Sequence, residues 1–159
     1  MSLEAVRAFF ASRAPEIAPM EAAESSATVT LAAQAFGVEE AQIAKTLALR
    51  VGDQAFLLVM RGTARLDNRK AKQAFGGKPR MLGAEEVTAL TGHPIGGVCP
   101  FGLPAPLPVY CDGSLRAFPE VLPAAGSTNS AVRLSPERLA ELVGGVWVDV
   151  AQDEAPAES

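Results

Sequence analysis

Hydrophobic and polar residues alternate in the middle of the chain, which is the pattern of a β-strand. In residues 45–51 every second position is aliphatic, and these positions are Leu47, Leu49 and Val51. Lys45 has the same parity, so it is expected on the apolar face of this strand. A Gly-Asp turn then leads into an apolar run at residues 55–61. The two segments predict an antiparallel hairpin of two central strands.

Apolar residues at helical spacing predict short helices elsewhere. They are expected at residues 2–13, 28–36, 68–75, 83–90 and 135–143, with one further helical turn at residues 39–44. The predicted N-caps are Ser2, Thr28, Asp67 and Ser135. A Ser, Thr or Asp before the first apolar residue and a Gly after the last one are typical helix boundaries. Further strands are predicted around residues 79–82, 107–111, 121–125, 131–134 and 146–150.

Strands and short helices therefore interleave irregularly, which fits neither a pure parallel sheet nor an all-β sandwich. We expect an α+β (mixed α/β) chain. It should form a single domain with a strongly curved mixed β-sheet or partial barrel surrounded by short helices. A length of 159 residues suits one domain, predicted to span residues 1–150. Residues 151–159 are small and acidic and are predicted to be a disordered tail.

The segment at residues 91–103 is rich in Gly and Pro but otherwise apolar. Four Gly and two Pro exclude a regular helix or a central strand, and the apolar residues place the loop against the core. The backbone amides of Gly96 and Gly97 are candidates to hold a carbonyl or carboxylate oxygen, because no side chain blocks the approach. A tight structural turn is the alternative.

The charge is unevenly distributed along the chain. The formal net charge of −4 argues against a general nucleic-acid binder, so no DNA partner is expected. However, residues 61–80 hold seven basic residues and one acidic residue. Such a local basic cluster favours a phosphate-bearing partner, and a solvated helix face is the alternative. No apolar stretch approaches the roughly 18 residues of a membrane span, which predicts a cytoplasmic protein without a membrane partner.

Few side chains offer catalytic chemistry. A lysine on the core side of a strand loses hydration and needs a partner, which makes Lys45 the most informative residue. The alternative is that its side chain points to water. His93 and Cys99 could form a thiol site, but a buried, inert thiol is the more common situation, and their roles stay open. No Walker, Rossmann or metal-ligand spacing is present, so no cofactor and no metal site are predicted.

Three segments together resemble a known family. They are Gln-Ile-Ala-Lys-Thr-Leu at residues 42–47, the segment at residues 61–67, and Gly-His-Pro-Ile-Gly-Gly-Val-Cys-Pro-Phe-Gly at residues 92–102. They are similar to the YbaK-type aminoacyl-tRNA-editing domains, which are related to the insertion domain of bacterial prolyl-tRNA synthetase. The resemblance runs over nearly the whole chain. It implies a free-standing deacylase that hydrolyses the ester between a wrong amino acid and the terminal ribose of a tRNA.

The resemblance also implies roles for individual residues. The catalytic residues would be Lys45, Gly96 and Gly97. The substrate-binding residues would be Val98, Pro100, Phe101, Gly102, Gly126, Ser127 and Thr128. The basic residues expected to bind tRNA are Arg61, Arg65, Arg69, Lys70 and Lys72.

The form of the glycine loop resembles branches of the family that act on Ser, Thr or Ala, with Cys a weaker expectation. The partners would be a mischarged tRNA and an aminoacyl-tRNA synthetase. Two alternatives remain at this point. One is a non-catalytic module that binds aminoacyl-tRNA or a synthetase, and the other is an unrelated thiol enzyme that uses Cys99.

Overall fold

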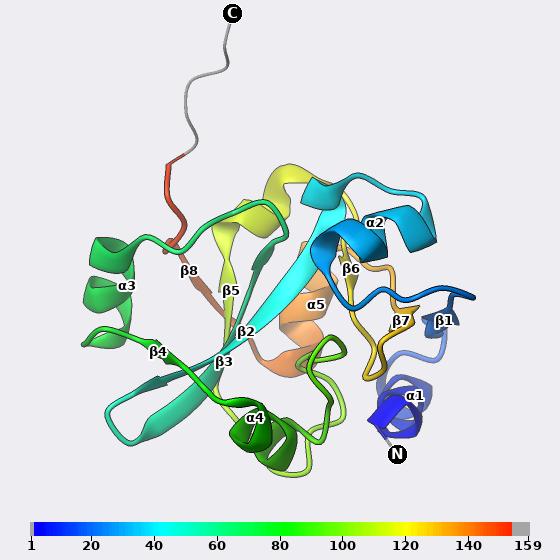
Figure 1. The fold of residues 1–159 in the computed structure, drawn as a ribbon, viewed down its shortest axis with the longest axis horizontal. Helices are drawn as coiled ribbons and strands as arrows, with labels where there is room; N and C mark the ends of the chain where they lie inside the picture. Colours follow the sequence, from blue (N-terminus) through cyan, green and yellow to red (C-terminus); the bar gives the residue numbers. More distant parts are fainter. Residues whose placement is uncertain (1, 154–159) are drawn as a thin grey trace, which may run out of the picture.

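A six-stranded mixed sheet forms the centre of the computed structural model, which describes residues 2–153 (Figure 1). Five strands follow the order β4-β2-β3-β5-β8, and β6 pairs with the start of β2. The strands are β2 (Ile43–Val51), β3 (Gln54–Arg61), β4 (Arg80–Met81), β5 (Val109–Asp112), β6 (Leu122–Pro123) and β8 (Val146–Val148). A second, two-stranded sheet pairs β1 (Met20–Glu21) with β7 (Ser130–Ala131). This architecture is the predicted mixed α/β fold, with an open strand path in the described residues.

The predicted hairpin is confirmed. Strands β2 and β3 pair antiparallel, with Lys45 opposite Met60 and Val51 opposite Gln54. β3 is buried over most of its length because both of its faces are covered. Leu57 and Val59 pack into one cluster, while the alternate residues Phe56, Leu58 and Met60 pack into another on the opposite face. This explains the continuous apolar run in the sequence.

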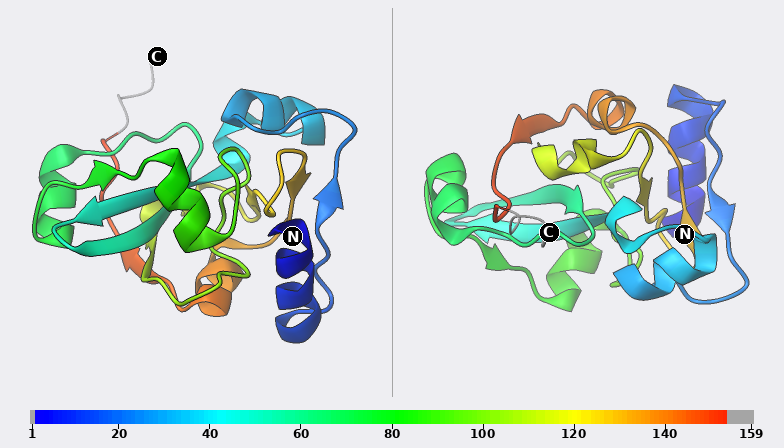
Figure 2. Two further views of the ribbon diagram at one scale, coloured as in Figure 1. Left: turned by 60° about the horizontal axis from the view of Figure 1, so that its bottom comes forward. Right: turned by 90° about the horizontal axis from the view of Figure 1, so that it is seen from above.

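Helices cover both faces of the sheet (Figure 2). The helices are α1 (Ser2–Arg13), α2 (Val29–Phe36), α3 (Asn68–Phe75), α4 (Ala84–Thr91) and α5 (Pro136–Val143), with 3₁₀ turns η1 (Glu40–Gln42) and η2 (Gly113–Ala117). Side chains of α1, α4, α5 and the glycine loop share the larger core cluster. Phe75 of α3 and the segment after β8 cover the other face of β3. A third cluster joins α2 to the beginning of β2.

Three of the four predicted caps are confirmed. The side chains of Thr28, Asp67 and Ser135 each accept a hydrogen bond from the backbone N–H three residues later. Ser2 is the exception, because it lies within α1 and its hydroxyl pairs with Nδ1 of His93. The predicted turn at residues 39–44 is shorter, since Ile43 and Ala44 already pair with β6.

Backbone pairing with the rest of the fold extends past residue 150. Ala151 bridges to Leu66, and the N–H of Gln152 donates to the carbonyl of Arg65 at 2.7 Å. The disorder predicted from residue 151 is therefore wrong for residues 151–153, while residues 154–159 lie outside the described part. Within residues 2–153, no helix has the length and apolar character needed to cross a membrane.

Candidate functional site

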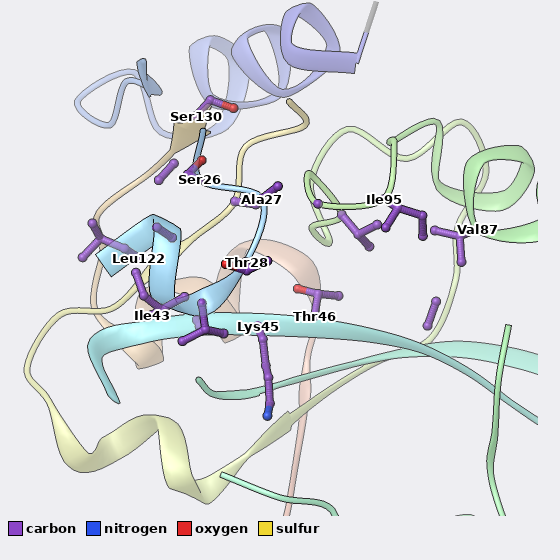
Figure 3. A pocket seen from close by; sticks show the side chains of 18 of the residues that line it. Ser26, Ala27, Thr28, Ile43, Lys45, Thr46, Val87, Ile95, Leu122 and Ser130 are labelled. Carbon is purple, nitrogen blue, oxygen red and sulfur yellow. The ribbon is translucent and has the colours of Figure 1, made fainter. Parts of the chain in front are cut away.

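A cavity of about 250 Å³ opens beside β2, between the start of α2 and the glycine loop (Figure 3). Its floor comes from Ala44, Thr46 and Ala48 of β2, and its walls include Thr28 and Ile95. Most lining residues are apolar. The volume is below the roughly 300–1,000 Å³ of sites that hold drug-sized ligands, so the cavity suits one small group rather than a whole nucleotide.

The glycine loop reaches this cavity because two of its residues lack side chains. Gly96 has φ +89°, and a Cβ there would lie 2.9 Å from the Cβ of Ala27. A Cβ at Gly97 would lie 2.8 Å from the backbone N of Ser127. Glycine at both positions therefore lets the loop pack directly on two neighbouring segments.

The two glycines differ in what their backbones can bind. The N–H of Gly97 donates to the carbonyl of Pro94 at 2.9 Å, and its carbonyl accepts from the N–H of Gly126 at 3.0 Å. The prediction that the Gly97 amide faces an oxyanion is thus disfavoured, since this amide closes a turn within the loop. Gly96 lines the cavity, as does Val98. The Gly96 amide stays a predicted contact for a substrate oxygen, and Val98 stays a predicted substrate-binding residue.

A buried histidine fixes the other half of the loop. His93 is fully buried, and its Nε2 donates to the carbonyl of Phe101 at 2.7 Å. The Ser2 hydroxyl pairs with Nδ1, so the partners fit a neutral ring that carries its proton on Nε2. Burial lowers the pKa of His93, although the hydrogen bond to Phe101 acts in the opposite direction. His93 therefore connects the glycine loop to α1.

Cys99 lies in the same cluster but is unsuited to nucleophilic chemistry. Its Sγ is 3.4 Å from Nε2 of His93, yet the residue is fully buried. Burial raises the pKa of the Cys99 thiol to about 12. A thiol with such a pKa is almost entirely protonated at neutral pH, so the geometry argues against the thiol-enzyme alternative.

Most of the predicted substrate-binding residues do not line the cavity but support the loop that does. Phe101 is buried against Phe9 and Phe10. Pro100 is buried in the same loop, and a Cβ at Gly102 would lie 2.8 Å from the backbone of Ala5. These residues hold the loop on α1. Among the predicted set, only Val98 lines the cavity.

The second predicted turn, residues 126–128, also supports the cavity walls without lining the cavity. The N–H of Ser26 donates to the carbonyl of Thr128 at 2.6 Å, and Ser127 Oγ bonds to Ser130 Oγ at 2.6 Å. Together with the Gly126 to Gly97 bond, these contacts tie the turn to two walls of the cavity. Gly126, Ser127 and Thr128 thereby shape the site without lining it.

Lys45 lies on the face of β2 that the sequence predicts, but this face points away from the cavity. Figure 3 shows its side chain leaving β2 on the side opposite to Thr46 and Ile95. The ammonium donates to the carbonyl of Ala64 at 2.5 Å. Burial lowers the pKa of Lys45, and the nearby positive charge of Arg65 lowers it further. The strand backbone at Lys45 borders the cavity, while its charge lies beneath the sheet, near Arg65.

Thr46 and Ser26 contribute polar atoms that the sequence did not single out. Thr46 Oγ1 and Ser26 Oγ are both buried and have no hydrogen-bond partner among the described residues, and both residues line the cavity. The alternation in residues 45–51 could have revealed Thr46, which takes the face opposite to Lys45. Ser26 precedes the α2 cap in a mixed segment and gave no signal.

The predicted tRNA-binding residues lie along the chain from the end of β3 to α3. Arg61 ends β3, Arg65 lies in the following loop, and Arg69 and Lys72 lie on α3, where they border a shallow hollow with Lys78. Lys70 instead bonds to Asp149 at 3.2 Å, to Asp153 at 2.8 Å and to the carbonyl of Ala151 at 2.9 Å. Its charge holds the C-terminal segment, so a role in tRNA binding is not supported for Lys70.

A family model described as an aminoacyl-tRNA editing domain matches residues 23–142. The chain belongs to this editing-domain family. The resemblance inferred from the sequence is thereby confirmed. Members of the family are aminoacyl-tRNA deacylases, which are hydrolases that act in trans-editing.

Relatives of the editing domain cover most of the chain. YwhH of Bacillus subtilis strain 168 is 49% identical over 155 residues, which are 96% of this chain and 99% of YwhH. EbsC of Enterococcus faecalis, named as a candidate Cys-tRNA(Pro)/Cys-tRNA(Cys) deacylase, is 29% identical over 125 residues, 77% of this chain and 76% of EbsC. A solved structure of a candidate trans-editing enzyme for prolyl tRNA synthetase has a TM-score of 0.88 at 37% identity, and the match covers 96% of this chain and 98% of that one.

No candidate metal centre is found among the described residues of the editing domain. Within residues 2–153, His, Cys, Asp and Glu side chains do not gather in groups of three or more that could hold an ion. The polar atoms of the cavity are hydroxyl and backbone groups, which are suited to hydrogen bonds with a small polar ligand.

Proposed function

We propose that this protein hydrolyses the ester that joins a small amino acid, Ser, Thr or Ala, to the terminal ribose of a mischarged tRNA. The observation that carries this proposal is the small cavity beside the glycine loop of an editing domain. It has room for an amino acid, and the nucleotide would stay at its mouth. The basic residues from Arg61 to α3 lie outside it, where the tRNA backbone would pass.

The proposed reaction needs no nucleophilic or general-base side chain. An aminoacyl ester is already labile, so holding the carbonyl and a water in attack geometry is sufficient for a useful rate. The amides of Gly96 and Val98 are the proposed donors to the oxyanion that develops on the carbonyl oxygen, and they are held in place by the turn that Gly97 closes. The proton of the attacking water passes to the ribose oxygen that leaves.

Lys45 is proposed to act on the terminal nucleotide from beneath β2. The guanidinium of Arg65 is close enough to the ammonium of Lys45 to disfavour the charge on the lysine. An anion placed between them would relieve this repulsion. A phosphate next to the terminal ribose is the proposed anion, and its position would fix the ester relative to Gly96.

Further tRNA phosphates are proposed to contact the basic residues Arg61, Arg65, Arg69 and Lys72. Each contact that releases a counterion makes the affinity more sensitive to salt, with a slope of roughly −0.7 to −0.9 per phosphate. The tRNA of proline is the first one to test, because two of the relatives are named for it or for its synthetase. Aminoacyl-tRNA is a cytoplasmic substrate, and the predicted cytoplasmic location rests on that proposal.

The direct test is release of amino acid from one tRNA charged in turn with Ser, Thr, Ala and Cys. We expect turnover of at least one of the first three. Turnover of Cys-tRNA alone would contradict the substrate assignment and would match the name of EbsC. Binding of every charged tRNA without turnover would replace the deacylase by a non-catalytic binding module.

A further inference from the structure

The hydroxyl of Thr46 is a buried hydrogen-bonding group without a partner among the described residues. Its Oγ1 has almost no solvent contact, and Thr46 lies in the lining of the cavity. Figure 3 shows the side chain projecting from β2 toward the space between Thr28 and Ile95. Buried polar atoms in folded proteins nearly always have a partner, so an exception in a cavity wall indicates a group supplied by the occupant.

The backbone of Thr46 is open to the same side. Along this edge of β2, Ile43 and Ala44 pair with β6, and Leu49 and Arg50 pair with β4. No described strand pairs with the residues between them. The carbonyl of Ala48 accepts from the N–H of Leu82 across this edge at 3.0 Å. Alternate residues of a strand direct their backbone groups to the same edge, so the N–H and C=O of Thr46 also face it.

Thr46 therefore presents a hydroxyl, an N–H and a C=O at one place in the cavity. The amino acid is the end of an aminoacyl-tRNA, so it reaches the most buried part of the site, while the ribose stays nearer the mouth. An amino acid carries an ammonium group and a carbonyl that suit the strand edge. A side-chain hydroxyl, which both donates and accepts, is the natural partner of Oγ1.

We propose that Thr46 reads the side-chain hydroxyl of the amino acid, so that the site prefers Ser and Thr esters to Ala and Val esters. This inference rests on the proposed function and narrows its substrate class. Val has the shape of Thr but would leave Oγ1 without a partner. A site built around a hydrogen bond rejects the analogue that lacks the group much more strongly than an apolar pocket rejects an added one.

The test compares Thr and Val esters on one and the same tRNA. We expect the unmodified protein to hydrolyse the Thr ester at least about tenfold faster than the Val ester, as one lost hydrogen bond to a buried group implies. In Thr46→Val this ratio should fall to about one. Thr46→Ser keeps the hydroxyl and should restore the preference, and Thr30→Val, on the exposed side of α2, is the matched control.

A binding measurement separates this inference from the proposed function. The probes are adenosine derivatives that carry threonyl or valyl through a stable 3′-amide, and the readout is the ratio of their Kd values. A threonyl preference that disappears in Thr46→Val supports the inference even if no ester is hydrolysed, an outcome that would contradict only the deacylase. The inference would be overturned if the unmodified protein bound both probes with equal Kd values. It would also be overturned if the ratio of the two Kd values were unchanged in Thr46→Val, or if the preference were lost in Ser26→Ala instead.

Discussion

Lys45 and Thr46 are neighbours in the sequence and act on opposite faces of β2. The Thr46 side chain enters the cavity, whereas the ammonium of Lys45 donates to the carbonyl of Ala64 on the other side. Successive side chains of a strand point to opposite faces, so these two neighbouring residues lie in different environments. We infer that Thr46 meets the amino acid and that Lys45 meets the nucleotide that carries it.

Gly97 should be intolerant of any side chain. In Gly97→Ala the new Cβ would lie 2.8 Å from the backbone of Ser127, so the loop or the turn must move. We expect a loss of about 1–3 kcal/mol in the free energy of unfolding and a loss of deacylation, because the Gly96 amide moves with the loop. Urea unfolding and a deacylation assay measure both. Gly113→Ala, with its nearest contact at 3.9 Å, is the control and should leave both nearly unchanged.

Acidification should destabilise the protein through His93. Burial lowers the pKa of His93 below its ordinary 6.5, so the unfolded chain binds a proton more readily than the folded one. Stability is then fully present above about pH 6.5 and falls as the pH drops below it. We expect urea midpoints to decrease between pH 7 and pH 5.5, and less so in His93→Gln, whose amide can still donate to Phe101. An equal decrease in both proteins would show that His93 is not the cause.

Cys99 should be dispensable for catalysis. Burial raises the pKa of its thiol to about 12, so a thiol reagent at pH 8 should label it only when the chain opens. Cys99→Ala should hydrolyse the same esters at a rate within about twofold of the unmodified protein, and Cys111→Ala is the control for removal of a buried thiol. Loss of turnover in a folded Cys99→Ala protein, with Cys111→Ala active, would revive the thiol enzyme.

Neighbouring basic residues of α3 should differ in their effect on tRNA affinity. Arg69 is exposed, whereas Lys70 bonds to Asp149, Asp153 and Ala151. Arg69→Ala should weaken binding and reduce the slope of log Kd against log salt by about one, whereas Lys70→Ala should change the slope much less. Filter binding at several salt concentrations measures this. The reverse order of effects would refute the assignment of Lys70 to the C-terminal segment.

Local features of the fold could be predicted from the sequence. Thr28 and Asp67 cap their helices because each needs only a backbone N–H three residues away. The β2–β3 hairpin also follows from a short turn and alternating residues. The parity of Lys45 was right for the same reason. Such contacts are set within a few residues, so pattern and capping chemistry are sufficient to find them.

The cavity could be predicted only in part, because its walls are distant in sequence. The Gly97 amide was predicted to bind a substrate oxygen, but in the folded loop its N–H donates to the carbonyl of Pro94. The Gly97 carbonyl accepts from the N–H of Gly126, which lies almost thirty residues later in the sequence. The resemblance implied that Lys45 acts together with Gly96 and Gly97, whereas the structure places its ammonium on the opposite face of β2 from the cavity. Both faces are covered, so parity identified the face but not what lies on it.

The most direct test of the account is deacylation by Lys45→Met at limiting tRNA, compared with the unmodified protein on its best Ser-, Thr- or Ala-charged substrate. Methionine keeps the length of the side chain and removes the charge that is proposed to fix the terminal nucleotide. We expect kcat/KM to fall about 100-fold, the scale of a misplaced reacting group, while the free energy of unfolding changes little. An unchanged kcat/KM would contradict the role of Lys45, and no turnover by the unmodified protein on any of the esters would contradict the deacylase itself.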